Sequence, residues 1–257
     1  MPLTPYVGPP SIGPAAAGPR STLPELAEAL GKAARTGSLA LAQGVQLKTE
    51  QLHALAEAIG EPLSPVALPP TKAIEVVTEV SVDGAIAVNA GWHHDQSFMA
   101  SPPDWSLLYC QHASSSSEAT VFADGCGVLQ FVSDGLLDVL RTLRLRHSAY
   151  YPSPDGEGAK EVAGAVHPLI VEVEGGGEAM FGAPATAAGI VGWTEPESNL
   201  LLQYLFTRLN WPEICVTHRW TKGDLLLWPN RRYAHRVLPL EGASTRSMYR
   251  VVGIWES

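Results

Sequence analysis

The sequence predicts a single α+β domain, mainly β, built on an antiparallel sandwich or jelly roll. Short apolar runs typical of strands recur along the chain, without the strand–helix alternation of a parallel sheet. Glycine and proline, at 24 and 21 residues, supply the many turns that such a fold requires. Hydrophobic residues make up 46% of the 257 residues, which is enough to bury a sizeable core.

Two helices are expected near the start. Thr22 and Glu25 have the spacing of a capping box and open the first helix. The apolar run 38–45 then predicts a short strand, and Thr49 opens a second helix with apolar residues on one face.

The rest of the chain is predicted to be mostly strands. Asp83-Gly84, the glycines at 175–177 and Lys222-Gly223-Asp224 mark turns. We expect strands at 74–82, 85–91, 106–113, 120–124, 147–151, 168–174, 178–184 and several within 214–257, and helices over about 128–143 and 194–209.

Composition argues against some classes of binding partner and indicates the cell compartment. The net charge of −9, from 17 basic and 26 acidic residues, argues against nucleic-acid or anionic-membrane partners. The three cysteines form no C-x-x-C pair and indicate reduced thiols. The proline-broken start has neither a signal peptide nor a span long enough for a bilayer. We expect a soluble, cytoplasmic protein, with residues 1–20 a flexible N-terminal segment and 21–257 the single domain.

The stretch GWHHDQSF, residues 91–98, contains a candidate metal-binding pair. In a strand, residues two apart face the same side, so His93 and Asp95 can reach one point while His94 faces away. One imidazole and one carboxylate are two thirds of the ligand set of non-haem Fe(II) oxygenases. The motif alone is unspecific, and a surface His–Asp pair is the alternative. His94 is expected to be structural or partly exposed.

Near the other end, His235 is followed by Arg246 and Arg250. Four residues apart in a strand, the two arginines face the same way. A guanidinium directed into a β-core needs a partner, and the carboxylate of a bound ligand is one in so acidic a protein. Pairing with an acid at the rim of the fold is the alternative.

These residues carry a family resemblance. Over roughly 21–256 the chain resembles the taurine catabolism dioxygenase (TauD/TfdA) family of Fe(II)- and 2-oxoglutarate-dependent dioxygenases. It is also similar to carbapenem synthase, around GIVGWTEPES and GDLLLWPNRR. The matching motifs are W-H-x-D-x-x-F at 92–98, PP-x-x-S-L-L at 102–108, T-x-F-A-D at 120–124, G-D-L-x-x-W-x-N-R at 223–231, His235, and R-x-M-x-R at 246–250.

The resemblance implies a double-stranded β-helix (jelly-roll, cupin-like) core with flanking helices. It also implies Fe(II), 2-oxoglutarate and O₂ as cofactors, with His93, Asp95 and His235 as the catalytic metal ligands. Two departures bear on the site: SSSSEA precedes Thr120 where relatives carry a Gly-Gly pair, and Pro229 stands where the family commonly has Asp.

The resemblance also implies the binding residues. Thr120 and Arg246 would hold the distal carboxylate of 2-oxoglutarate. Arg250 would support the cosubstrate or bind an anionic group of the substrate. Asn89 and Phe98 would line the substrate side.

The expected reaction is oxidation of an unactivated C–H bond of a small polar or anionic metabolite, with release of succinate and CO₂. Hydroxylation is the usual outcome, and a tailoring step in secondary metabolism fits. Halogenation is disfavoured because Asp95 occupies the carboxylate position. Two alternatives remain: a non-catalytic jelly-roll protein that binds a metal or 2-oxoglutarate, and a zinc hydrolase using the same triad. A homo-oligomer is left open.

Overall fold

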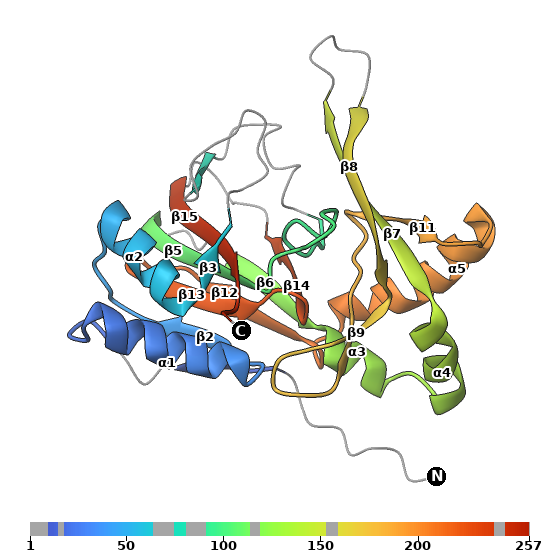
Figure 1. The fold of residues 1–257 in the computed structure, drawn as a ribbon, viewed down its shortest axis with the longest axis horizontal. Coiled ribbons are helices and arrows are strands. Elements are labelled where there is room, and N and C mark those ends of the chain that lie inside the picture. Colours follow the sequence, from blue (N-terminus) through green and yellow to red (C-terminus); the bar gives the residue numbers. More distant parts are fainter. Residues whose placement is uncertain are drawn as a thin grey trace.

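The computed structural model describes residues 10–14, 18–63, 75–80, 91–113, 119–152, 159–238 and 245–256 (Figure 1). It is mainly β with flanking helices, as predicted. The helices are α1 (Leu23–Arg35), α2 (Thr49–Ile59), α3 (Gly125–Gln130), α4 (Asp134–Thr142), α5 (Glu195–Phe206) and the short 3-10 helix η2 (Thr207–Asn210). The strands are β1 (Ile12–Pro14), β2 (Leu39–Ala42), β3 (Glu61–Pro62), β4 (Glu75–Val80), β5 (Trp105–Ala113), β6 (Ala119–Asp124), β7 (Arg144–Pro152), β8 (Ala159–Pro168), β9 (Ile170–Glu172), β10 (Glu178–Met180), β11 (Ala187–Ile190), β12 (Cys215–Arg219), β13 (Leu225–Pro229), β14 (Tyr233–Val237) and β15 (Thr245–Ile254).

The strands form a large sheet and several small ones. The large sheet has the order β1-β2-β13-β5-β15-β3, and β4 also pairs with β15. A smaller sheet has the order β12-β6-β14. Further along, β7 is the centre of the sheet β11-β7-β8, while β9 and β10 pair with each other. The long hairpin of β7 and β8 extends away from the two main sheets (Figure 1).

Helices α1 and α2 cover the outer face of the large sheet (Figure 1). In α1, Thr22 and Glu25 make the predicted capping box. The buried faces of both helices pack on alternate residues of β5 and β13, because successive strand residues face opposite sides. This core contains Leu26, Leu30, Leu52, Leu55, Trp105, Leu107, Leu225 and Leu227.

The opposite face of the large sheet packs against the small sheet. Leu226 and Trp228 of β13 form one hydrophobic cluster with Phe122 of β6 and Tyr233 of β14. Phe122 and Trp228 meet edge to face with ring centroids 5.2 Å apart. Aromatic side chains therefore fill part of the space between these two sheets. This packing borders the candidate site described below.

Two elements differ from the prediction. The single helix expected over 128–143 is two helices, because Ser133 caps α4 by accepting from the N–H of Leu136. Strand β8 was not predicted, since its sequence AKEVAGAVHP is rich in alanine and glycine. Its pairing with β7 forms the strand despite that composition.

Part of the segment expected to be flexible is paired. Residues Ile12–Pro14 of the 1–20 segment form β1, which lies parallel to β2. Main-chain hydrogen bonding to Leu39–Leu41 orders these three residues. The strand expected at 85–91 lies almost entirely outside the described residues. In the part of the chain that is described, no helix is long and apolar enough to cross a membrane.

Candidate metal centre

Three predicted ligands, His93, Asp95 and His235, lie together in the structure. Each offers one ligand atom, and these three atoms lie within 4.8 Å of one another. His93 and His235 form an isolated antiparallel bridge and exchange both main-chain hydrogen bonds, at 3.0 Å and 2.8 Å. Such a pair projects both side chains to the same side, and the two imidazole centroids are 4.2 Å apart.

Asp95 reaches the cluster from a turn, so the prediction that it lies in a strand was wrong. Only His93 is paired, and the chain then turns through Gln96, which has a positive φ of 50°. Asp95 is 2% exposed. Its Oδ1 accepts from Arg250 Nη1 at 2.9 Å, and its Oδ2 lies 3.8 Å from His235 Nε2.

The buried side chain of Asn230, in the turn between β13 and β14, holds this segment. Its Oδ1 accepts from the main-chain N–H of Asp95, and its Nδ2 donates to the carbonyls of Asp95 and Pro103, all within 2.9–3.0 Å. His94 Nδ1 in turn donates to the carbonyl of Asn230 at 2.8 Å. The sequence placed Asn230 in the motif at 223–231 without a role, because its partners come from distant segments.

His94 is buried and hydrogen-bonded within the protein, as expected of a structural histidine. It is 1% exposed, and its ring lies 4.8 Å from that of Phe181. Burial lowers the pKa of His94 to about 4, so the ring is neutral at physiological pH. The hydrogen bond to Asn230 and this packing account for an imidazole at this position.

The charge state of the cluster suits a cation. Burial lowers the pKa of both His93 and His235, so both rings are neutral. Burial disfavours ionisation of Asp95, but the positive charge of Arg250, with a smaller contribution from the two nearby imidazoles, outweighs it, and the pKa of the carboxyl lies below its ordinary value. Two neutral imidazoles and one carboxylate are the protonation states that a divalent metal requires.

The lone pairs fit a metal as well. His93 Nδ1 lies 2.9 Å from the carbonyl of Gly91, which can only accept, so the proton is on Nδ1 and Nε2 carries the lone pair. Asp95 Oδ2 is buried and has no hydrogen-bond partner among the described residues. One carboxylate oxygen tied to Arg250 and the other facing His235 is the arrangement of a ligand that binds through a single oxygen. These residues fit an Fe(II)-type centre with open coordination positions.

Thr120 lies on β6, two residues before Phe122, whose ring stacks on that of His235. Thr120 is 1% exposed, and its Oγ1 accepts from the indole N–H of Trp220 at 2.9 Å. The main chain of Arg246 pairs with Ala113 of β5, but its side chain lies outside what the structure describes. Arg250 is half-buried and bonded to Asp95, so it faces the centre.

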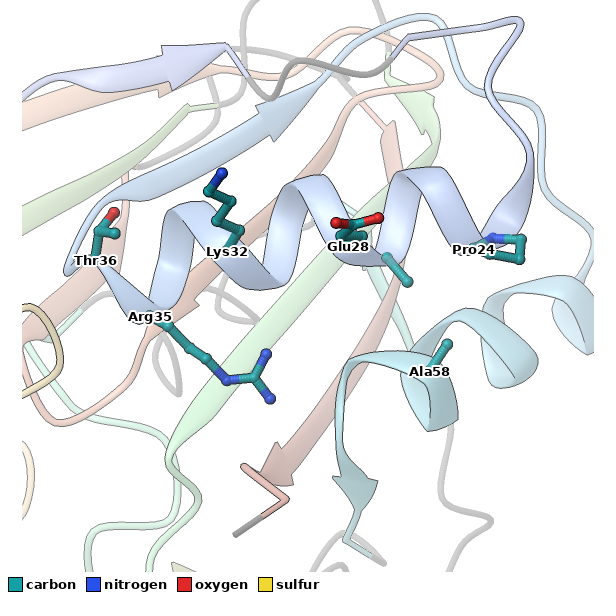
Figure 2. Close-up of a pocket in the computed structure, with 7 residues that line it drawn as sticks. Pro24, Glu28, Lys32, Arg35, Thr36 and Ala58 are labelled. Carbon is teal, nitrogen blue, oxygen red and sulfur yellow. The ribbon is translucent and has the colours of Figure 1, made fainter.

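The structure describes one of the other two predicted substrate residues, Phe98, and not Asn89. Phe98 is half-buried in the turn that follows Asp95. Asn89 lies outside the described residues. A separate hollow of about 640 Å³ lies over α1 and the end of α2, lined by Glu28, Lys32 and Arg35 among others (Figure 2). None of the predicted site residues lines it, so it is no part of the metal centre.

Two histidines and one carboxylate on a mainly β fold are the ligand set of non-haem Fe(II) oxygenases. The chain belongs to the taurine catabolism dioxygenase TauD, TfdA family, whose family model matches residues 1–252. The predicted resemblance is thereby confirmed. Several curated relatives of the chain are named alpha-ketoglutarate-dependent dioxygenases.

Curated relatives carry diverse names. The chain is 27% identical over 192 residues to the alpha-ketoglutarate-dependent 2,4-dichlorophenoxyacetate dioxygenase of Burkholderia sp. (strain RASC), covering 68% of this chain and 65% of that protein. It is 26% identical to the alpha-ketoglutarate-dependent sulfate ester dioxygenase of Pseudomonas putida, over 80% of this chain and 72% of that protein. It is 25% identical to pentalenolactone F synthase of Streptomyces arenae, over 65% and 62%. The match thus spans slightly less than two thirds of the first relative's length.

Solved structures share the fold. AAD-2, in complex with Mn(II) and N-oxalylglycine, superposes with a TM-score of 0.78 at 21% identity, covering 94% of this chain and 93% of that one. A taurine dioxygenase from Burkholderia xenovorans gives a TM-score of 0.73 at 22% identity, over 97% and 89%. At these identities the likeness shows the fold alone.

Proposed function

We propose that this chain is a dioxygenase that couples oxidative decarboxylation of 2-oxoglutarate to oxidation of an unactivated C–H bond in a small polar or anionic metabolite. The balanced reaction consumes O₂ and yields succinate, CO₂ and, in the usual outcome, a hydroxylated product. The observation that carries the proposal is the group of ligand atoms of His93, Asp95 and His235, within 4.8 Å of one another, with Asp95 Oδ2 unbonded among the described residues.

Within this proposal the chain's residues have distinct roles. His93, Asp95 and His235 hold Fe(II), which with its cosubstrate supplies the oxidising chemistry when bound. Thr120 and Arg246 bind the distal carboxylate of 2-oxoglutarate. The aromatic layer of Phe122 and Trp228 beside His235 keeps water from one side of the centre, with ring centroids 5.9 Å and 5.0 Å from that imidazole.

The substrate side is assigned to Arg250, Phe98 and Asn89. Arg250 contributes a cation next to Asp95, which favours a substrate with a carboxylate, sulfonate or sulfate group. The named relatives that act on an aryloxyacetate and on sulfate esters, and the pentalenolactone F synthase, support a small acid or a natural-product intermediate.

The fold proposal is a double-stranded β-helix formed by residues 21–257 as one domain. It is supported by the alternation of strands between the two sheets along the chain. β5 lies in the large sheet and β6 and β12 in the small one, after which β13, β14 and β15 change sheet at each step. Closing two sheets in this way brings ends of strands distant in sequence to one mouth.

Anaerobic absorption spectroscopy tests the function. Fe(II) and then 2-oxoglutarate are added to metal-free protein, and a weak visible charge-transfer band is expected. The band should be lost in His235→Ala and weakened in Arg246→Ala. His53→Ala, at a half-exposed position on α2, is the matched control and should leave the band unchanged.

The alternatives make different predictions in the same preparation. A non-catalytic binding protein would give the band without succinate release in air. A zinc hydrolase would bind metal without any band, and 2-oxoglutarate would not alter its spectrum. Succinate release that requires Fe(II), and is not supported by Zn(II), would exclude both.

A further inference from the structure

A buried indole orients the hydroxyl of Thr120. The N–H of Trp220 donates to Thr120 Oγ1 across 2.9 Å, and both side chains are buried. An indole nitrogen can only donate, so Thr120 accepts in this bond and keeps its own hydroxyl proton for another partner. Among the described residues, Trp220 is the one hydrogen-bond partner of Thr120 Oγ1.

The hydroxyl lies on the face of β6 that carries the metal centre. Thr120 and Phe122 are two residues apart on this strand and share one face. The ring of Phe122 stacks on that of His235, with centroids 5.9 Å apart. The proton that Thr120 does not give to Trp220 is therefore available on the side of the iron ligands.

Trp220 is itself held in place. The ring of His218 meets it edge to face at 4.6 Å and 87°. His218 Nε2 donates to Asp224 Oδ2 at 3.1 Å, and the same oxygen accepts from the main-chain N–H of Thr221 at 2.8 Å. Asp224 and His218 are both buried, so the indole is supported by a bonded pair and has a single orientation.

We propose that Trp220 is a positioning residue for the cosubstrate, which directs the hydroxyl proton of Thr120 toward the distal carboxylate of 2-oxoglutarate. This inference rests on the proposed function. Without the indole N–H, the hydroxyl could turn and present a lone pair to the carboxylate, which repels it. Trp220 would therefore act on the distal carboxylate and leave binding of the 2-oxo acid end unchanged.

The test measures anaerobic binding of 2-oxoglutarate to the Fe(II) protein by its charge-transfer band. Trp220→Phe keeps the packing and removes the N–H, and Thr120→Val removes the hydroxyl. Pyruvate, a 2-oxo acid without a distal carboxylate, is titrated beside it. Trp105→Phe is the matched control, because Trp105 is fully buried in the other core and its N–H has no hydrogen-bond partner in the described part.

We expect Thr120→Val to weaken 2-oxoglutarate binding about tenfold or more, the size of a hydrogen bond to a charged group. Trp220→Phe should weaken it about three- to tenfold, since the hydroxyl remains but is no longer directed. In the Thr120→Val background, Trp220→Phe should have no further effect. Neither change should alter pyruvate binding, and Trp105→Phe should match the wild type for both ligands.

The results that overturn the inference are distinct from those that overturn the function. If Trp220→Phe binds 2-oxoglutarate as the wild type does, or weakens it equally in the Thr120→Val background, Trp220 is a packing residue only. If the wild type gives no band at all, the proposed function fails and this inference fails with it. Should Trp220→Phe not fold, Trp220→Met, which also lacks a donor, serves the same comparison.

Discussion

Arg250 donates to Oδ1 of Asp95 at 2.9 Å, while Oδ2 of the same carboxylate faces His235. The two oxygens thus have separate roles, one in an ion pair and one at the metal position. Arg250 is thus the partner of an acid, and we propose that it is also a cation for a bound anion. A guanidinium has five N–H donors, so a single arginine can bond a carboxylate and other acceptors at the same time.

Substitution of Arg250 separates these two roles. We expect Arg250→Gln to raise the KM of an anionic substrate about tenfold or more, the size of a charge-assisted hydrogen bond. The Kd for Mn(II) should stay within about threefold, because the loss of the bond that holds Asp95 weakens metal binding while the removal of a neighbouring cation strengthens it. Substrates are found by screening carboxylates, sulfonates and sulfate esters for faster succinate release. Loss of Mn(II) binding in Arg250→Gln would show that the arginine serves mainly to hold Asp95.

Substitution of Asn230 should weaken metal binding without touching a ligand. Asn230→Ala leaves the main-chain groups of Asp95 and the carbonyl of Pro103 without partners. We expect about 10- to 100-fold weaker Mn(II) binding by calorimetry and a loss of about 3 kcal/mol in the unfolding free energy. Asn230→Asp, which keeps the acceptor for the N–H of Asp95, is the comparison. Wild-type Mn(II) affinity in Asn230→Ala would contradict a positioning role.

The metal-free protein should lose stability in mild acid because of His147. Its ring is fully buried beside Phe181, and burial, followed by the nearby His94 and His167, lowers its pKa to about 3. Below the ordinary histidine pKa of about 6.5, the unfolded chain takes up a proton that the folded one does not, so stability falls as pH falls.

Urea unfolding at pH 7 and pH 5 measures this effect. His147→Phe keeps an aromatic ring and removes the titrating group. The unfolding free energy of this variant should therefore fall between pH 7 and pH 5 by about 2 kcal/mol less than that of the wild type. Equal losses in the two proteins would mean that His147 does not contribute.

Gly253 on β15 should not tolerate a side chain. A Cβ there would collide with the ring of Trp105 and come within 2.5 Å of the carbonyl of Glu61. We expect Gly253→Ala to lower the unfolding free energy by at least about 2 kcal/mol, as overpacking does. Gly135→Ala is the control, because a Cβ added at this position would meet nothing within 4 Å. This change in α4 should raise the unfolding free energy by about 0.5 kcal/mol. A Gly253→Ala protein as stable as the wild type would rule out this collision.

Local signals in the sequence predicted the elements that depend on local chemistry. The capping box at Thr22 and Glu25 predicted α1, and Lys222-Gly223-Asp224 predicted a turn in which Gly223 has a φ of +87°. Strand β8 escaped prediction because its pairing with β7, and not its composition, makes it a strand. The segment predicted as one helix over 128–143 is two helices, because the hydroxyl of Ser133 accepts from the N–H of Leu136 and so begins a new helix there.

The sequence by itself determined which residue types could form the site, since imidazole and carboxylate at 93, 95 and 235 have metal-ligand chemistry wherever they lie. Only the tertiary structure decided how they meet. The bridge of His93 to His235, the turn at Asp95 and the grip of Asn230 all depend on hydrogen bonds between segments far apart in the chain. Such hydrogen bonds form only when the strands have paired. Neither the local spacing of residues nor the alternation of side chains between the two faces of a strand therefore predicts them.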